Sequence, residues 1–506
     1  MVIPASAQRG NPLVQFDGQS IDQMIGDFMT ERHIPGVTLA IVQAPYISRA
    51  TGYGVTDLQT RRLASPKTLW DVGQLTRGYT AVAVMQLVEA GSLKLDEAIG
   101  AHVTDLPPAW QAITVRQLMA HASGLPDYTK QPGFDPARQY APAQLLSLVR
   151  EKPAAFKAGT QAAASATDFL LLALAIERAS GMSYEAFVTK NQIERLGLKN
   201  TIFVSGLASV KQETLDAAPF RHDKFLQERP YVDPTETATG YTWSEGALVP
   251  ARRNHASAWI GGGAIYASAE DISLWDIGLA GGLLVRAKEN RDILYNAVPV
   301  DGMVVPANAG WRFPKHKGLM DIEGNVPGFS CYLARFTDPG ELLCVTLCGN
   351  RDGIDFTDLG RRIAGAFDAR LGPPAVKGMT SRESTFTVEA TVDRLESFLK
   401  AKGVEVSARI DHSSAAKKAG LELPRTQVLI FGNPAVGTRL MQRQRSIALE
   451  LPLRVVVWQE ADGTVWAGYN DIAGLAARHS ITDQDASVES MRNALEAAVK
   501  YATAPY

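Results

Sequence analysis

The side chains that most often carry out protein chemistry are sparse in this sequence. Its three cysteines, Cys331, Cys344 and Cys348, are too few for a disulfide framework, and their spacing matches no metal-binding motif. Cys344 and Cys348 fall in one apolar run typical of a strand, which would place them about 13 Å apart, too far to form a disulfide. The eight histidines include no His-x-x-x-His pair. We therefore expect three small buried residues at the cysteine positions, and neither a metal site nor a cofactor.

An acidic residue and a histidine are adjacent at Asp411 and His412, as in some charge-relay pairs. The surrounding pattern favours a strand, and neighbouring residues of a strand point to opposite faces of the sheet. We therefore interpret this pair as structural.

The composition argues against two kinds of partner. Basic side chains number 51 and acidic side chains 53, so the chain has no excess of positive charge for binding nucleic acid or an anionic membrane. The longest apolar stretches are much shorter than the roughly 20 residues of a membrane-spanning helix, so no membrane span is expected.

The N-terminus carries one indication of cellular location. Ala5-Ser6-Ala7, before Gln8, has the small-x-small form of a signal-peptidase site. This pattern predicts a periplasmic or secreted protein.

Helical and strand patterns are mixed over the first 370 residues. We predict a helix over 21–32, a strand over 37–42, and a second helix over 79–89 that is apolar on nearly every side and therefore buried. Later, two apolar runs (329–336 and 342–347) flank Thr337-Asp338-Pro339-Gly340, which has the composition of a turn and predicts a β-hairpin. The pattern favours a mixed α/β fold in which helices flank an antiparallel sheet and a helical subdomain is inserted.

A chain of 506 residues is too long for one hydrophobic core. Residues 1–16 are expected to be a flexible N-terminus or the remnant of a signal peptide, and residues 17–371 a large domain. A Gly-, Pro- and Ser-containing stretch over 372–383 is typical of a linker. Residues 384–506 are expected to form a smaller α+β domain that ends in a helix.

The large domain resembles serine β-lactamases and penicillin-binding proteins, in particular class C β-lactamases with their esterase and peptidase relatives. Similar segments occur in the family order over about 350 residues. They are Ile34-Pro35-Gly36-Val37, Trp70-Asp71-Val72-Gly73, Leu93-Lys94-Leu95-Asp96, Ile113-Thr114-Val115-Arg116-Gln117-Leu118, His121-Ala122-Ser123-Gly124-Leu125-Pro126, Gly261-Gly262-Gly263, Ser268-Ala269-Glu270-Asp271 and Val326-Pro327-Gly328-Phe329-Ser330.

The resemblance implies a serine hydrolase built on three motifs: Ser-x-x-Lys, Tyr-x-Asn, and His-x-Gly or Lys-Thr-Gly. A serine needs a nearby base to become a nucleophile. In this sequence the serine and lysine positions hold Gln74 and Arg77, the second motif is Ala164-Ser165-Ala166, and the third is Ile322-Glu323-Gly324, where only the glycine survives. A glutamine amide is no nucleophile for acyl transfer, and arginine cannot act as the base.

Other residues offer alternatives. Ser123 and Ser165 could act as nucleophiles, although the resemblance makes His121 and Ser123 structural residues of a turn and places no histidine beside Ser165. We expect Arg77 to pair with a carboxylate, Asp168 or, less favourably, Glu323, which strand alternation turns away from Ile322 and Gly324. Alternatively, Arg77 and Gln74 form a small anion-binding site suited to a carboxylate.

The last part of the chain resembles a small family of unknown function, number 302 in its series. The similar segments are Thr391-Val392-Asp393-Arg394-Leu395, Arg409-Ile410-Asp411-His412, Ala419-Gly420-Leu421, Phe431-Gly432-Asn433-Pro434 and Leu451-Pro452-Leu453. We expect a pseudoenzyme with a binding or scaffolding role for a small molecule or peptide. An active serine hydrolase with unusual residues, of the esterase, β-lactamase or D-amino-acid peptidase type, is the alternative. The sequence leaves the ligand and the oligomeric state open.

Overall fold

The computed structural model describes residues 14–504 except 44–45, 211–235, 298, 301–302, 305–306, 314–317, 338–342, 375, 377 and 482–485. The chain divides into two compact units, residues 1–313 with 319–367 in the first and residues 368 onward in the second. Two expected features lie outside the described residues, namely the Ala5-Ser6-Ala7 site and the hairpin turn residues 338–340.

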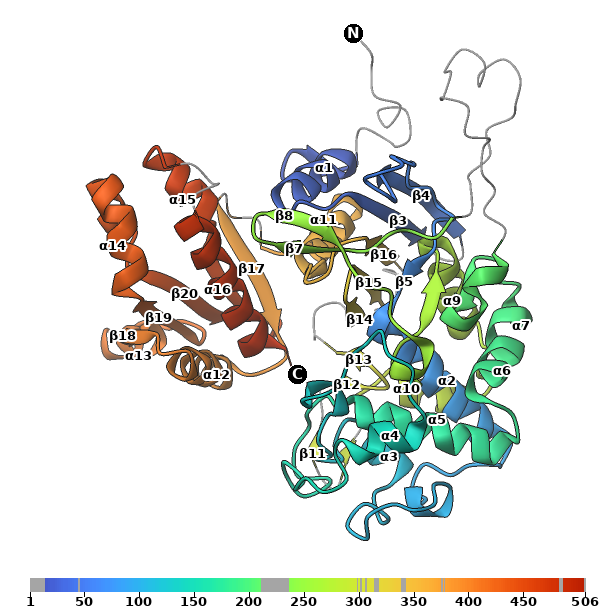
Figure 1. The fold of residues 1–506 in the computed structure, drawn as a ribbon. Helices are drawn as coiled ribbons and strands as arrows, with labels where there is room; N and C mark the ends of the chain where they lie inside the picture. Colours follow the sequence, from blue (N-terminus) through green and yellow to red (C-terminus); the bar gives the residue numbers. More distant parts are fainter. Residues whose placement is uncertain are drawn as a thin grey trace, which may run out of the picture. The chain divides into compact units, whose positions relative to one another are not determined.

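The first unit is built on a seven-stranded antiparallel sheet (Figure 1). Its strands, in spatial order, are β12 (Ala307–Asn308), β13 (Trp311–Arg312), β14 (Leu319–Val326), β15 (Phe329–Phe336), β16 (Leu343–Gly349), β3 (Gly36–Gln43) and β4 (Tyr46–Gly54). Both strands of the predicted hairpin are present as β15 and β16, and the predicted first strand is β3. The predicted α/β fold with an antiparallel sheet is therefore confirmed.

Helices cover both faces of this sheet. On one face α11 (Thr357–Phe367) packs against β15 and β16, and α1 (Ile21–Glu31) packs on α11. On the other face lies α9 (Ala269–Ala280), where the hydroxyls of Ser273 and Thr346 are 2.9 Å apart. Because side chains alternate along a strand, Thr346 faces α9 while its neighbour Leu347 faces α11.

The remaining helices form the helical subdomain and the segment that joins it to the sheet. They are α2 (Thr76–Glu89), α3 (Val115–Met119), α4 (Pro142–Ser147), α5 (Ala166–Ser180), α6 (Tyr184–Val188), α7 (Glu194–Leu196) and α10 (Lys288–Leu294). Ten of the fourteen residues of α2 are buried, as its sequence predicts, and α2 packs against α5. Short strands β5 (Trp70–Asp71), β9 (Ile265–Ala267) and β6 (Thr201–Phe203) form a small sheet beside the start of α2. No helix in the described ranges is both long and apolar enough to span a membrane.

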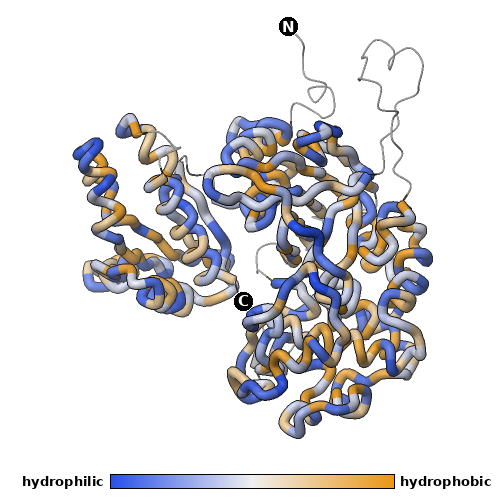
Figure 2. Tube along the Cα trace, in the orientation of Figure 1, coloured by the Kyte–Doolittle hydropathy of each residue, from blue (hydrophilic) through white to orange (hydrophobic). Residues whose placement is uncertain are grey.

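The second unit has its own five-stranded antiparallel sheet and its own core. Its strands, in spatial order, are β17 (Met379–Ser384), β21 (Val465–Asn470), β20 (Leu453–Gln459), β19 (Thr426–Gly432) and β18 (Glu405–Asp411). The helices are α12 (Val388–Ala401), α13 (His412–Lys418), α14 (Pro434–Arg443), α15 (Ile472–Arg478) and α16 (Ala486–Thr503). Figure 2 shows hydrophobic residues in the interior of each unit. The predicted α+β domain with a terminal helix is confirmed.

Three expectations need correction. The linker expected over 372–383 is shorter, because β17 begins at Met379 and pairs with β21. His412 begins α13 rather than lying on a strand, and the Asp411 carboxylate caps that helix by accepting from the Ser414 amide. Cys331 and Cys348 form a disulfide, since the register of β15 and β16 places them directly opposite each other, with Cα atoms 4.1 Å apart. Cys344 is free and buried.

Candidate active site

The motif positions at the start of α2 contain two side chains that reach the surface. The short helix η2 (Gly73–Leu75) leads directly into α2. From Asp71 to Thr80 every residue is buried except Gln74 and Arg77, which are partly exposed. Residues three apart share one face of a helix, so the structure presents these two polar side chains on the same side.

Gln74 is fixed by the backbone of β14. Its side-chain oxygen Oε1 accepts a hydrogen bond of 2.6 Å from the backbone amide of Asn325. A backbone N–H can only donate, so the oxygen of the Gln74 amide must face β14 and the Nε2 group must point away from Asn325. We refer to Gln74, Gly324 and Asn325 as the turn cluster.

Gly324 allows this contact because two backbones nearly touch. A Cβ atom at Gly324 would overlap the carbonyl oxygen of Val72, and one at Gly73 would lie 3.0 Å from the Asn325 nitrogen. Gly73 also has a φ of +53°, in the left-handed region that favours glycine. The glycine retained from the third motif therefore keeps β14 against the turn that carries Gln74.

Ile322, at the position assigned to the third motif, is a buried apolar residue. Its side chain is 1% exposed and contacts the start of α2, where its Cδ1 atom would lie 3.7 Å from a Cβ at Gly78. Glu323 points elsewhere, as strand alternation predicts, and its Oε1 lies 3.4 Å from Nη1 of Arg312. Neither residue gives the site a group that could move a proton to or from a ligand.

His121, Ser123 and Asp168 form a second group, the buried cluster. Nδ1 of His121 is 2.8 Å from Oδ2 of Asp168, and the hydroxyl of Ser123 donates to Oδ1 of the same carboxylate. Ser123 Oγ also accepts from the Leu125 amide at 3.0 Å. All three side chains are almost completely buried, which agrees with the structural role expected for His121 and Ser123.

Arg77 contacts this buried cluster through the imidazole ring. Its Nη1 lies 3.2 Å from Nε2 of His121, and its guanidinium lies over the ring of Phe169, 5.4 Å from the centroid. Arginine can only donate, so Nε2 must accept and the proton of a neutral imidazole lies on Nδ1, facing Asp168. The structure thus links Arg77 to Asp168 by way of His121, a connection that the sequence did not indicate.

Burial dominates the electrostatics of this cluster. Burial, followed by the charges of Arg77 and Lys130, lowers the pKa of His121 well below its usual value, which favours the neutral ring. Burial also raises the pKa of the Asp168 carboxyl, against the hydrogen bond from Ser123 and the charge of Arg77. The two donors that face Asp168 satisfy both of its oxygens.

The second motif contributes backbone and capping groups instead of an acid or a base. Ser165 is 1% exposed and is the N-cap of α5, where its hydroxyl accepts from the Thr167 amide at 3.2 Å. Its own amide lies 3.3 Å from Nδ1 of His121. Ala166 is buried and Ala164 partly exposed, and a methyl group offers no proton at either position. Across the described residues, no group of three or more His, Cys, Asp or Glu could hold a metal ion.

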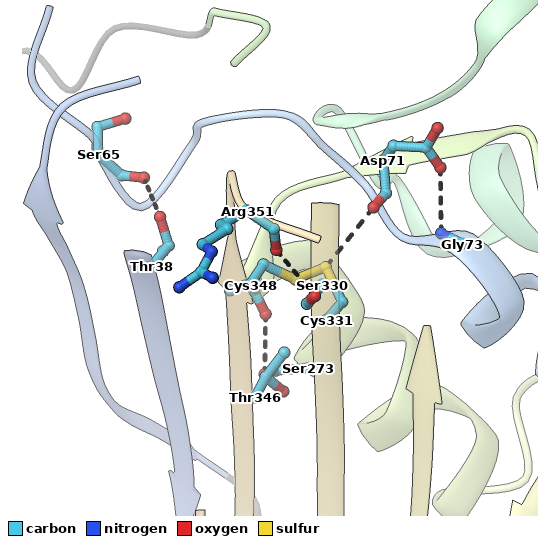
Figure 3. Close-up of a disulfide and its surroundings, with 11 residues drawn as sticks. Thr38, Ser65, Asp71, Gly73, Ser273, Ser330, Cys331, Thr346, Cys348 and Arg351 are labelled. Atoms are coloured by element: carbon cyan, nitrogen blue, oxygen red, sulfur yellow. Dashed lines mark hydrogen bonds between the residues drawn. A yellow bond between two sulfur atoms is a disulfide. The ribbon is translucent and has the colours of Figure 1, made fainter. Parts of the chain in front are cut away.

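Behind the turn lies a buried carboxylate that the sequence did not single out. Asp71 accepts from the Gly73 amide at 3.1 Å and from Nδ2 of Asn254 at 3.0 Å. Burial raises its pKa from 3.8 to about 6, in spite of these two hydrogen bonds. Figure 3 shows the Cys331–Cys348 disulfide beside it, with the Cys331 sulfur 3.8 Å from the Asp71 carbonyl oxygen. The register of β15 and β16 places residues 331 and 348 opposite each other, so a prediction of strand pairing could have indicated this bond.

Comparison with known proteins identifies relatives that match parts of the chain. The chain is 42% identical over 126 residues to the fluoride-specific ion channel FluC 1 of Brucella suis, a match that covers 25% of this chain and 50% of that protein. It is 27% identical over 190 residues to protein flp of Staphylococcus aureus, covering 37% of this chain and 38% of that protein. The chain thus spans half or less of the length of these curated relatives.

The fold is shared with a solved penicillin-binding protein homologue. The octameric homologue from Pyrococcus abyssi has a TM-score of 0.56 and 20% identity, with 88% of this chain and 89% of that chain covered. Residues 380–499 match the family model "Domain of unknown function DUF302". Residues 21–366, more than two thirds of the chain, match the family model "Beta-lactamase", and the protein therefore belongs to the β-lactamase family.

Proposed function

We propose that this protein is a catalytically inactive member of the β-lactamase family that binds a carboxylate-bearing ligand, a small molecule or a peptide, through Gln74 and Arg77. The observation that carries the proposal is the orientation of Gln74. With Oε1 held by the Asn325 amide, the Nε2 group of this partly exposed residue is left to donate. A permanent positive charge at Arg77 on the same helical face adds the electrostatic attraction that a carboxylate requires.

Inactivity is supported by the chemistry of each replaced position. No nucleophile stands at Gln74, no titratable base at Arg77, and no proton-transfer group at Ala164, Ala166 or Ile322. The two serines considered as substitutes are almost completely buried and engaged, Ser123 with Asp168 and Ser165 as a helix cap. Members of a catalytic set act as a unit, so the loss of several leaves little activity.

We propose that the protein is exported to the periplasm or secreted. The Cys331–Cys348 disulfide is typical of proteins from oxidising compartments, and the Ala5-Ser6-Ala7 pattern points in the same direction.

The decisive test is covalent labelling. The protein is incubated with a fluorescent penicillin and, separately, with an activated fluorophosphonate, and its intact mass is measured, with an active penicillin-binding protein as the positive control. We expect no adduct. An adduct mapped to Ser123, Ser165 or another residue of the site would instead support the alternative, an active serine hydrolase that uses unusual residues.

A further inference from the structure

The side-chain carbonyl of Gln74 is already bound to a backbone amide of the site. The Asn325 amide lies on β14 next to the turn, and β13 pairs with β14 only at Arg312 and Asp321, so the edge of β14 at Asn325 faces the turn and not another strand. Gly73 and Gly324 bring the two backbones together there. A backbone N–H aimed at one point from a rigid strand is the kind of group that holds the carbonyl oxygen of a bound acyl compound.

We infer that Gln74 is an internal ligand that occupies the backbone amide of Asn325, so that this one residue weakens the binding of neutral carbonyl compounds at that amide and favours carboxylates. The two ends of its amide have different functions. Oε1 accepts the hydrogen bond of the Asn325 amide and so blocks that donor, whereas Nε2 provides N–H donors on the side away from Asn325. The second function rests on the proposed carboxylate binding, whereas the first does not depend on it.

The energetics favour the closed arrangement. A neutral carbonyl group gains one hydrogen bond at Asn325 but must first break the 2.6 Å bond from Asn325 to Gln74. An exchange of one hydrogen bond for another gives little net free energy. A carboxylate gains binding free energy without breaking this hydrogen bond, because it accepts from Nε2 and is attracted by the charge of Arg77 while Oε1 stays on the Asn325 amide.

Two substitutions separate the two functions. Gln74→Ala removes both the internal carbonyl and the donor. Gln74→Glu keeps an acceptor for the Asn325 amide but replaces the Nε2 donor with a second carboxylate oxygen. The matched probes are N-acetylphenylalanine and N-acetylphenylalaninamide, which differ only in having a carboxylate or a neutral amide at one end. Binding is measured by calorimetry, and the Asn325 amide is followed by hydrogen exchange in the full-length protein.

We expect Gln74→Ala to bind the neutral amide about three- to tenfold more tightly than the wild type, as removal of one competing hydrogen bond predicts. Gln74→Glu should leave amide binding unchanged and weaken binding of the acid at least tenfold. Without ligand, the Asn325 amide should exchange faster in Gln74→Ala than in Gln74→Glu. If the wild type binds neither probe but the exchange difference is present, the proposed function fails and the internal ligand stands. Equal exchange in the two variants, or no gain of amide binding by Gln74→Ala, overturns the inference.

Discussion

The turn cluster and the buried cluster differ in both residue type and arrangement. In the turn cluster, Gly324 lies so close to the turn at Gly73 that a Cβ at either position would contact the other backbone, and Gln74 is no nucleophile for acyl transfer. The buried cluster contains a serine, a histidine and an aspartate, the residue types of a hydrolytic triad, yet Ser123 donates to Asp168 and Nε2 of His121 contacts Arg77. In a working triad that nitrogen takes the proton of the serine.

The contrast shows that the hydrogen-bond partners of a polar cluster, and not its residue types alone, determine its possible chemistry. In the buried cluster every functional group is already engaged within the protein and closed to solvent. In the turn cluster the groups reach the surface but lack a nucleophile. Under the proposed function, neither cluster carries out acyl transfer, and the ligand binds at the partly exposed residues Gln74 and Arg77.

The contrast between the two clusters would not hold if substitutions at Gln74 and Arg77 alone were enough to create an active enzyme. In the double variant Gln74→Ser with Arg77→Lys, we expect kcat/KM for p-nitrophenyl acetate to remain several orders of magnitude below that of an active family esterase. Each missing acid–base function costs a factor of about 10² to 10⁴, and Ala164, Ala166 and Ile322 still provide none. The same double variant with Ala164→Tyr, Ala166→Asn and Ile322→Lys is the control. A value for the double variant within tenfold of the esterase would contradict the assignment.

The buried cluster should be important for stability. Asp168→Ala leaves Nδ1–H of His121 and the Ser123 hydroxyl without their acceptor in a dry environment. We expect a loss of about 3 to 5 kcal/mol in the free energy of unfolding, measured by urea denaturation.

Asp292→Ala is the matched control for Asp168→Ala. The Asp292 side chain is 46% exposed and pairs with Lys288 at 2.6 Å within α10, so its removal should change stability by less than about 0.5 kcal/mol. Equal effects of the two substitutions would show that the buried cluster contributes no more than an ordinary surface ion pair.

Asp71, behind the turn cluster, should differ from Asp168 in that its replacement stabilises the protein at neutral pH. Its pKa is raised from 3.8 to about 6, so the folded state holds the proton more tightly than the unfolded state. The stability that this proton provides is present at low pH and is lost as the pH rises through about 6. Asp71→Asn removes the titration and should stabilise the protein relative to wild type by about 1 to 3 kcal/mol at pH 7.5 but not at pH 4.

Asn254 makes the asparagine variant compatible with the site. Its Oδ1 is buried and has no hydrogen-bond partner within the described part of the chain, so it can accept from the new amide after the side chain rotates. Unfolding curves of wild type and Asp71→Asn at the two pH values give the measurement. A difference in stability that does not change with pH would mean that Asp71 stays ionised in the folded protein.

Much of the fold could be predicted from local patterns. The apolar face of α1, the nearly uniform apolar character of α2 and the two runs around the hairpin turn all led to elements that the structure contains. The disulfide is not apparent from a single strand. Cys344 and Cys348 both lie on β16 and are too far apart to bond, whereas Cys331 lies on β15. The pairing of Cys331 with Cys348 depends on strand register, which a turn sets and which the composition of a single strand does not reveal.

The residue types alone carry the proposal of inactivity, because a glutamine amide, a guanidinium and three alkyl side chains cannot supply a nucleophile and a base in any arrangement. Only the tertiary structure decided what the replacements do. The Gln74 side chain meets an amide 251 residues away, and Arg77 reaches Asp168 through a histidine that the sequence assigned to a turn. Hydrogen-bond partners are set by the packing of distant segments and by donor–acceptor geometry at short range, and neither is visible in the local pattern of the chain.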